Sequence, residues 1–191
     1  MNTTDINAFG IVLKPLKEEY LPFLVDWRND PKVIVNMDDR RKVNLKVMHT
    51  WFNINQNKQD TIAYVAFVND KPFAYVAFSK IGLKENVAEG GMFFNPEMIN
   101  SGIFANVFLA REIILKNINT SIIFSVVRNI NKRGIKIQEA FGAVLDRKDE
   151  AFNYYFLYKK NRAPVLEKYA DILGYKEDFD CLLRNWLYGN Q

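Results

Sequence analysis

Cysteine and histidine are scarce in this chain of 191 residues, which contains one of each, Cys181 and His49. One cysteine cannot close a disulfide within the chain, and one cysteine with one histidine cannot complete the cage of a structural zinc ion. We therefore expect no disulfide and no metal site. The sequence also lacks the long apolar run of a membrane helix and the basic-then-apolar start of a secretory signal. We expect a cytoplasmic protein without a membrane partner.

An excess of one charge is missing too. The 26 Lys and Arg residues against 22 Asp and Glu residues leave a net charge of +4, with both signs interspersed. Nucleic-acid-binding domains concentrate basic residues, so we expect no nucleic-acid partner, whereas a slight positive charge suits an anionic small ligand. No stretch rich in proline, glycine or serine divides the chain. We expect one domain over residues 1–191, with residues 161–191 as a C-terminal helical extension.

Apolar residues, at 49% of the chain, follow strand and helix periods in turn. Strands are predicted over residues 9–16, 61–68, 73–80, 86–95, 121–127 and 152–160, and helices over residues 17–29, about 45–55, 104–115 and 130–141. Asn69 and Asp70 begin a connection, residues 69–72, that is typical of a hairpin, because both residue types tolerate a positive φ. Gly90 and Gly91 indicate a bulge or a splayed end in the fourth strand. The predicted fold is α/β or α+β, with a mixed sheet and helices on both faces.

The stretch Asn131–Ala143, NKRGIKIQEAFGA, resembles the second acyl-CoA motif of the GCN5-related N-acetyltransferases, the GNAT superfamily. Asn131, Glu139 and Gly142 match that motif, and Gly134 stands at its small residue. The resemblance implies that Asn131 bonds the pantetheine amide while the small residue lets the cofactor lie close. Taken alone, the same residues are equally typical of a capped helix that ends at a glycine.

The preceding stretch, residues 89–114, fits the other cofactor motif of the family, with strand, loop and helix in order. Such a loop works because unpaired N–H groups at a helix N-terminus bind the pyrophosphate of coenzyme A. Gly102 matches the first glycine of the loop, but Phe104 stands at the second and Ile99 at the usual Gln or Arg. The resemblance covers residues 9–160. It implies a mostly antiparallel sheet with a splayed fourth strand, and acetyl-CoA or another short acyl-CoA as cofactor.

Candidate binding residues follow from these motifs. Those assigned to the cofactor are Met92, Phe93, Phe94, Gly102, Ile103, Phe104, Ala105, Asn106, Asn131 and Arg133. The run Trp27-Arg28-Asn29-Asp30-Pro31 resembles the branch with ribosomal-protein N-terminal acetyltransferases and N-acyltransferases of nucleotide-linked amino sugars, and otherwise is only a helix stop. Residues assigned to the acceptor are Arg28, Asn29, Trp51 and Tyr64. The basic residues Arg128, Lys132, Arg133 and Lys136 either screen the adenosine 3′-phosphate or form a solvated helix face.

Two residues are candidates for proton transfer. Glu89 stands where relatives carry a glutamate base, although a glutamate before two glycines can also simply bond neighbouring backbone. His49 titrates in the useful range, although lone histidines are mostly surface or packing residues. The usual thiol-protonating tyrosine of the family is replaced by Gln138. Tyr154, Tyr155 or water could take its place, or the thiolate could leave unaided.

The resemblance implies an N-acyltransferase that moves an acetyl or short acyl group from acyl-CoA to an amine. We favour, as acceptor, the primary amine of a nucleotide-linked amino-deoxysugar, such as a dTDP-3-amino-3,6-dideoxyhexose, for surface polysaccharide synthesis such as that of lipopolysaccharide. The alternatives are a protein N-terminal acetyltransferase and a non-catalytic acyl-CoA-binding module. A homodimer is compatible with the sequence.

Overall fold

The computed structural model describes residues 4–189. The strands are β1 Ile6–Ala8, β2 Ile11–Pro15, β3 Ile62–Val68, β4 Lys71–Lys84, β5 Val87–Phe94, β6 Ile122–Arg128, β7 Val144–Lys148 and β8 Phe152–Tyr158. The helices are α1 Leu21–Asn29, α2 Pro31–Ile34, α3 Leu45–Gln56, α4 Phe104–Asn117, α5 Lys132–Ala140, α6 Lys159–Ile172, α7 Lys176–Phe179 and α8 Asn185–Tyr188, with short helical turns η1 Glu18–Tyr20 and η2 Asp180–Arg184. None of the described helices is long and apolar enough to cross a membrane.

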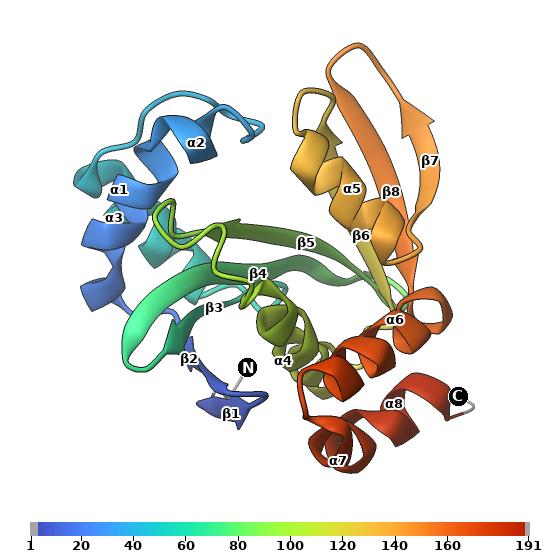
Figure 1. The fold of residues 1–191 in the computed structure, drawn as a ribbon. Helices are drawn as coiled ribbons and strands as arrows, with labels where there is room; N and C mark the ends of the chain where they lie inside the picture. The colour runs from blue at the N-terminus through green and yellow to red at the C-terminus, as the bar shows by residue number, and fades with distance from the viewer. Residues whose placement is uncertain (1–3, 190–191) are drawn as a thin grey trace.

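The eight strands form one sheet in the order β1-β2-β3-β4-β5-β6-β8-β7. Every neighbouring pair is antiparallel except β5 and β6, which confirms the predicted mixed, mostly antiparallel sheet. β5 and β6 pair only from Val87 to Glu89 on β5, and then β5 continues with β4 while β6 continues with β8. The sheet therefore opens into a V (Figure 1). This confirms the splayed strand.

The two glycines of β5 sit inside the V but are not themselves irregular. Gly90 and Gly91 stay in register with Phe78 and Ala77 of β4, and the break in register falls later in β4, between Ser79 and Lys84. A Cβ on Gly90 would lie 2.7 Å from the Ile123 side chain of β6. Gly90 is therefore required because β6 approaches closely at the base of the V.

Two separate cores hold the helices on the two faces of the sheet. One face packs against α4 and α6 through residues such as Phe108, Leu109 and Leu166. The other face packs against η1, α1 and α3 through Tyr20, Leu24, Trp27 and Trp51. In Figure 1, α4, α5 and α6 lie together, apart from the group formed by α1, α2 and α3. The helices α4 and α6 therefore flank the V on one face of the sheet, and η1, α1 and α3 flank it on the other.

Several predicted boundaries differ from those observed, three of them as follows. The strand predicted over 9–16 begins at Ile11, because Phe9 and Gly10 adopt positive φ angles, 53° and 71°, and turn the chain from β1 into β2. The hairpin connection is only Asn69 and Asp70, with φ of 48° and 60°, so β4 already begins at Lys71. The last strand ends at Tyr158 rather than at residue 160, and α6 follows directly.

A buried ion pair joins α6 to α4. Glu112 and Arg162 are both fully buried, and Nε of Arg162 lies 3.0 Å from each oxygen of the Glu112 carboxylate. Nη1 of Arg162 also donates to the backbone oxygens of Ser121 and Leu157. A buried charge left without its partner is strongly destabilising, so this pair ties the position of α6 to that of α4.

Candidate functional site

The open V exposes backbone of β5. Beyond Glu89, the edge of β5 that faces β6 has no strand partner among residues 4–189, so alternate N–H and C=O groups of residues 90–94 on that edge can bond a ligand. A Cβ on Gly91 would meet nothing within 4 Å. The backbone at Gly91 is therefore accessible. The next residue, Met92, is one of the predicted cofactor residues, and this assignment stays a prediction.

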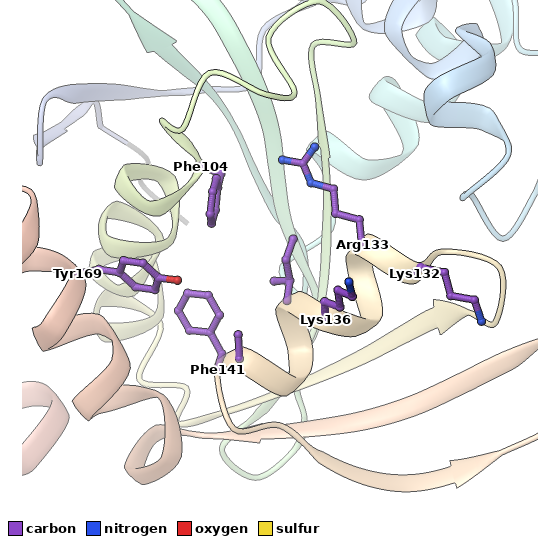
Figure 2. Close-up of a pocket in the computed structure, with 8 residues that line it drawn as sticks. Phe104, Lys132, Arg133, Lys136, Phe141 and Tyr169 are labelled. Carbon is purple, nitrogen blue, oxygen red and sulfur yellow. The ribbon is translucent and has the colours of Figure 1, made fainter.

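A cavity of about 400 Å³ lies between α4 and α5 on one side of the V. Its lining residues are Phe104, Lys132, Arg133, Lys136, Ile137, Ala140, Phe141 and Tyr169 (Figure 2). Phe104, Phe141 and Tyr169 supply aromatic walls, and the first turns of α5 supply three cations. The combination suits a ligand with a flat, apolar ring and several negative charges.

Tyr169 is a residue of this cavity that the sequence analysis missed. It comes from α6, in the C-terminal segment, and its ring stacks on that of Phe141 with centroids 5.8 Å apart at 30°. Figure 2 shows the Tyr169 ring pointing towards the space between α4 and α5. No local motif marks this tyrosine, because only the packing of α6 on α4 brings it there.

The N-termini of α4 and α5 differ in a way that matters for anions. Gly102, with φ of 79°, turns the chain into α4, and no side chain among the described residues caps that helix. Its first N–H groups therefore remain available to an anion. At α5, by contrast, Oδ1 of Asn131 accepts the N–H of Gly134 at 2.8 Å. Asn131 thus acts as a helix cap, and only its Nδ2 is left for a ligand.

Other predicted cofactor residues are partly engaged already. Arg133 donates to the backbone oxygen of Ile99, so its side chain spans from α5 to the loop before α4. Asn106 donates from Nδ2 to the backbone oxygen of Phe9 at 2.7 Å and ties α4 to the β1–β2 turn. The partly buried residues Met92, Phe94, Ile103 and Phe104 pack on the α4-side core, together with buried Ala105 of α4. Phe93 lies apart from them, stacked on Tyr75 at the opposite face.

Arg28 and Asn29 shape the other side of the V by holding the loop of residues 35–44. The buried guanidinium of Arg28 donates through Nη2 to the backbone oxygen of Asp39, and Asn29 exchanges two hydrogen bonds with the backbone of Val43 at 2.7 and 2.9 Å. Burial lowers the pKa of Arg28, although Asp39 and Asp38 oppose the shift. Its buried Nη1 has no hydrogen-bond partner within the described chain.

Asp38 is a second residue that the sequence analysis missed. Partial burial raises the pKa of Asp38, the charge of Glu89 raises it further, and Arg128 and Arg28 oppose the rise. The loop of residues 35–44 therefore brings a carboxylate into the same charged cluster as Glu89 of β5 and Arg128 of β6. Asp38 stands among several acidic and basic residues in the sequence, and no local signal distinguishes it.

Glu89 and His49 occupy different places. Glu89 is the last β5 residue paired with β6; its side chain is 31% exposed, and its Oε2 lies 2.5 Å from Nζ of Lys80. Nδ1 of His49 lies 2.8 Å from Glu18, which follows β2. β3 and β4 lie between β2 and β5 in the sheet, and no ion pair joins His49 to Glu89 among the described residues. The structure does not bring His49 to Glu89.

The aromatic acceptor candidates lie on opposite faces. Trp51 packs on the α1-side core, with its ring centroid 6.3 Å from that of Tyr75, on the face towards which Glu89 projects. Tyr64 is only 3% exposed and belongs to the α4-side core. It therefore lies apart from Arg28, Asn29 and Trp51.

The two tyrosines considered for protonation of the thiolate point to opposite faces of β8, and Gln138 stands at the position of the usual tyrosine. Oε1 of Gln138 is buried and has no hydrogen-bond partner in the described part of the chain. Tyr155 is buried, and burial raises its pKa. Tyr154, on the opposite face of β8, donates to Oδ2 of Asp149 at 2.8 Å. These contacts do not indicate which group would protonate the thiolate.

No protein-family model and no curated protein matches the sequence. Solved structures do match the fold. An apo structure of FdhC, described as a nucleotide-linked sugar GNAT, superposes with a TM-score of 0.75 at 17% identity, over 91% of this chain and 100% of that one. Spermidine N-acetyltransferase from Vibrio cholerae, with CoA and spermine, gives a TM-score of 0.71 at 14% identity, over 81% and 98%. RimL, a ribosomal L7/L12 α-N-protein acetyltransferase in complex with coenzyme A, gives 0.68 at 14%, over 81% and 98%.

Proposed function

We propose, on the premise that this chain has the fold of the GCN5-related N-acetyltransferases, that it is an acyl-CoA-dependent N-acyltransferase. One observation carries the proposal. The V between β5 and β6 joins a basic, aromatic cavity beside the uncapped end of α4 to a charged cluster that contains Glu89 and Asp38. An anionic acyl donor fits the first region, and an amine fits the second.

Coenzyme A fits the residues of the donor side. The free N–H groups at the start of α4 suit its pyrophosphate, and Lys132, Arg133 and Lys136 suit its 3′-phosphate. The walls formed by Phe104, Phe141 and Tyr169 suit its adenine. The pantetheine arm would follow the open edge of β5, where backbone groups can bond its amides.

Acyl-CoA supplies a thioester carbonyl that an amine can attack. The carboxylates of Glu89 and Asp38 attract the acceptor as an ammonium ion, and Glu89 accepts its proton, directly or through a water. The neutral amine then forms the amide bond to the carbonyl carbon while the carbon–sulfur bond breaks and the thiolate leaves. N–H groups of residues 90–94 on the open edge stabilise the negative charge that develops on the carbonyl oxygen.

The acceptor that we favour is a nucleotide-linked amino sugar. The similarity to FdhC supports this choice, as does the buried Nη1 of Arg28, which has no hydrogen-bond partner among residues 4–189 and suits a negative group on the acceptor. Acceptors of the spermidine or ribosomal-protein kind are the alternatives, since proteins that act on them share the fold to a similar degree.

A thiol-release assay tests the proposal. Acetyl-CoA is mixed with the protein and with, in turn, amino-sugar nucleotides, peptides with free N-termini, and spermidine, while calorimetry measures the binding of coenzyme A. We expect binding of coenzyme A and thiol release only with amino-sugar nucleotides. Turnover only with a peptide or only with spermidine would show that this amine, and not an amino-sugar nucleotide, is the acceptor. Binding without turnover on any amine would leave a non-catalytic module, and no binding of coenzyme A would refute the proposal.

A further inference from the structure

Five aromatic side chains form a row on one face of β6 and β8. This row, here named the aromatic ladder, consists of Phe124, Phe152, Tyr154, Phe156 and Tyr158. The ring centroids of neighbouring members lie 5.2 to 6.4 Å apart. All five are partly exposed, and none belongs to either core of the described chain. A contiguous row of exposed aromatic rings on a sheet indicates a binding surface.

The aromatic ladder lies on the face of the sheet that carries Glu89. Ile123 and Leu157 point to the opposite face, where they pack in the core with α4 and α6. Because side chains alternate along a strand, Phe124 and its partner Phe156 point the other way. Phe124 is also in register with Glu89 of the neighbouring strand, and residues in register share a face. The row therefore starts beside the proposed base and runs away from it along β6 and β8.

Cations lie over the rings. Lys84 lies 5.7 Å from the ring centroid of Phe156, Arg128 lies 5.0 Å from that of Phe152, and Arg147 lies 4.1 Å from that of Tyr154. Nε of Arg128 is buried and has no hydrogen-bond partner in the described structure. Arg128 is four residues beyond Phe124, roughly 13 Å further along the strand.

The carboxylates of this face are already engaged by hydrogen bonds or by cations. Asp149 accepts the N–H groups of Ala151 and Phe152 at 2.8 and 2.7 Å, and these bonds lower its pKa. Glu89 is paired with Lys80. Asp38 faces Arg28 and Arg128. The face that surrounds the ladder therefore favours an anionic occupant.

We propose that the aromatic ladder binds the nucleobase and the diphosphate of the acyl acceptor, an inference that rests on the function proposed above. An aromatic base stacks on exposed rings, and guanidinium and ammonium groups bind the phosphates. With its amine at Glu89, the rest of such an acceptor extends along the ladder towards Arg128. A second copy of this chain fits less well, because a two-fold contact would set one cation-bearing face against another.

Calorimetry with nucleoside diphosphates tests the inference. The full chain is first saturated with coenzyme A, which blocks the cavity between α4 and α5, and is then titrated with thymidine, uridine and guanosine diphosphate. Phe124→Leu removes a ring and Arg128→Gln removes a charge. Tyr188→Leu is the matched control, because Tyr188 is an exposed aromatic residue of α8 outside both regions. Near-ultraviolet circular dichroism and thermal melting confirm that each variant is folded.

We expect the wild type to bind at least one of these diphosphates and each ladder variant to bind it about 10-fold or more weakly. Tyr188→Leu should match the wild type, and coenzyme A affinity should be unchanged in all variants. Binding of coenzyme A but of no diphosphate would overturn the ladder assignment and leave the acyltransferase proposal standing. Unweakened binding by both ladder variants would overturn it too. So would a dimer, seen by sedimentation, that these substitutions dissociate while diphosphate binding persists.

Failure of coenzyme A to bind would refute the acyltransferase proposal instead. The same titration without coenzyme A then decides the ladder separately. Binding that the ladder substitutions weaken would support the site, and binding that they leave unchanged, or no binding, would overturn it.

Discussion

The proposed donor and acceptor sides of the V use different kinds of chemical group. The donor side uses a helix end without a cap, an open strand edge and basic residues on the first turns of α5. The acceptor side uses side chains from distant elements: Asp38 from a loop, Glu89 from β5 and the aromatic ladder from β6 and β8. In the proposed function, backbone groups bind the one constant ligand, coenzyme A, whereas side chains can be substituted to suit a particular acceptor. The difference teaches that the donor follows from the fold and the acceptor from individual side chains.

The largest expected effect is a loss of stability where α6 packs on α4, on the proposed donor side. Arg162→Met removes the closer partner of the buried Glu112 carboxylate and leaves it only Arg111, 3.8 Å away, so the free energy of unfolding should fall by about 3 to 5 kcal/mol. Urea unfolding measures the loss. The double variant Arg162→Met with Glu112→Leu removes both charges of the pair and should recover only part of the loss, because Arg111 then loses the carboxylate that lies 3.8 Å from it. A single variant as stable as the wild type would show that the pair does not hold α6 to α4.

A second prediction separates chemistry from donor binding. Glu89→Gln should lower turnover about 100-fold or more, because the amide cannot accept the proton, while the affinity for coenzyme A stays unchanged. Steady-state kinetics with acetyl-CoA and calorimetry measure the two quantities. His49→Gln is the comparison variant, since His49 pairs with Glu18 of η1 rather than with Glu89. Loss of turnover in His49→Gln but not in Glu89→Gln would transfer the role of base to His49.

A third, smaller effect concerns the aromatic wall of the cavity on the proposed donor side. Tyr169→Leu removes one aromatic wall of the cavity, so coenzyme A should bind about 5- to 10-fold more weakly, while nucleoside diphosphates should bind the ladder as before. Calorimetry measures both affinities, with Tyr188→Leu again as the control. An equal loss for the two ligands would mean that the two sides are not independent.

The smallest prediction concerns pH on the acceptor side. Hydrogen bonds from Ala151, Phe152 and Tyr154 lower the pKa of Asp149 from 3.8. On acidification the unfolded state therefore takes up this proton first, so the stabilisation is full above about pH 5 and is lost as the pH falls towards the folded pKa. Urea midpoints of the wild type and Asp149→Asn should differ most above about pH 5, and the difference should shrink as the pH falls below 3.8. A constant difference would contradict the assigned role of these bonds.

Local signals account for the parts that could be predicted. Asn131 marks the start of α5 because its side chain caps the helix, and Gly102 marks the entry to α4 because the turn needs a positive φ. The glycine pair of β5 marks the V because Gly90 admits the close approach of β6. Each of these features depends on a few neighbouring residues, so the sequence carries it directly.

The failures have equally definite causes. Phe9 adopts a positive φ, which is rare for an aromatic residue, so Gly10 alone signals the turn between β1 and β2. The segment Phe152–Tyr158 is apolar or aromatic on both faces, and no alternation of polarity indicates which face is covered. The aromatic ladder therefore could not be recognised before β6 and β8 were paired.

The amino-acid pattern alone specifies most of the succession of helices and strands and the caps and glycines at their ends, because these depend on short-range sterics and hydrogen bonds. Tertiary structure decides which side chains meet across the V. Asp38, Glu89 and Arg128 come from three segments far apart in the chain, and Tyr169 reaches its cavity only through the packing of α6. Such meetings depend on strand order, register and the burial of whole faces, which are properties of the complete sheet.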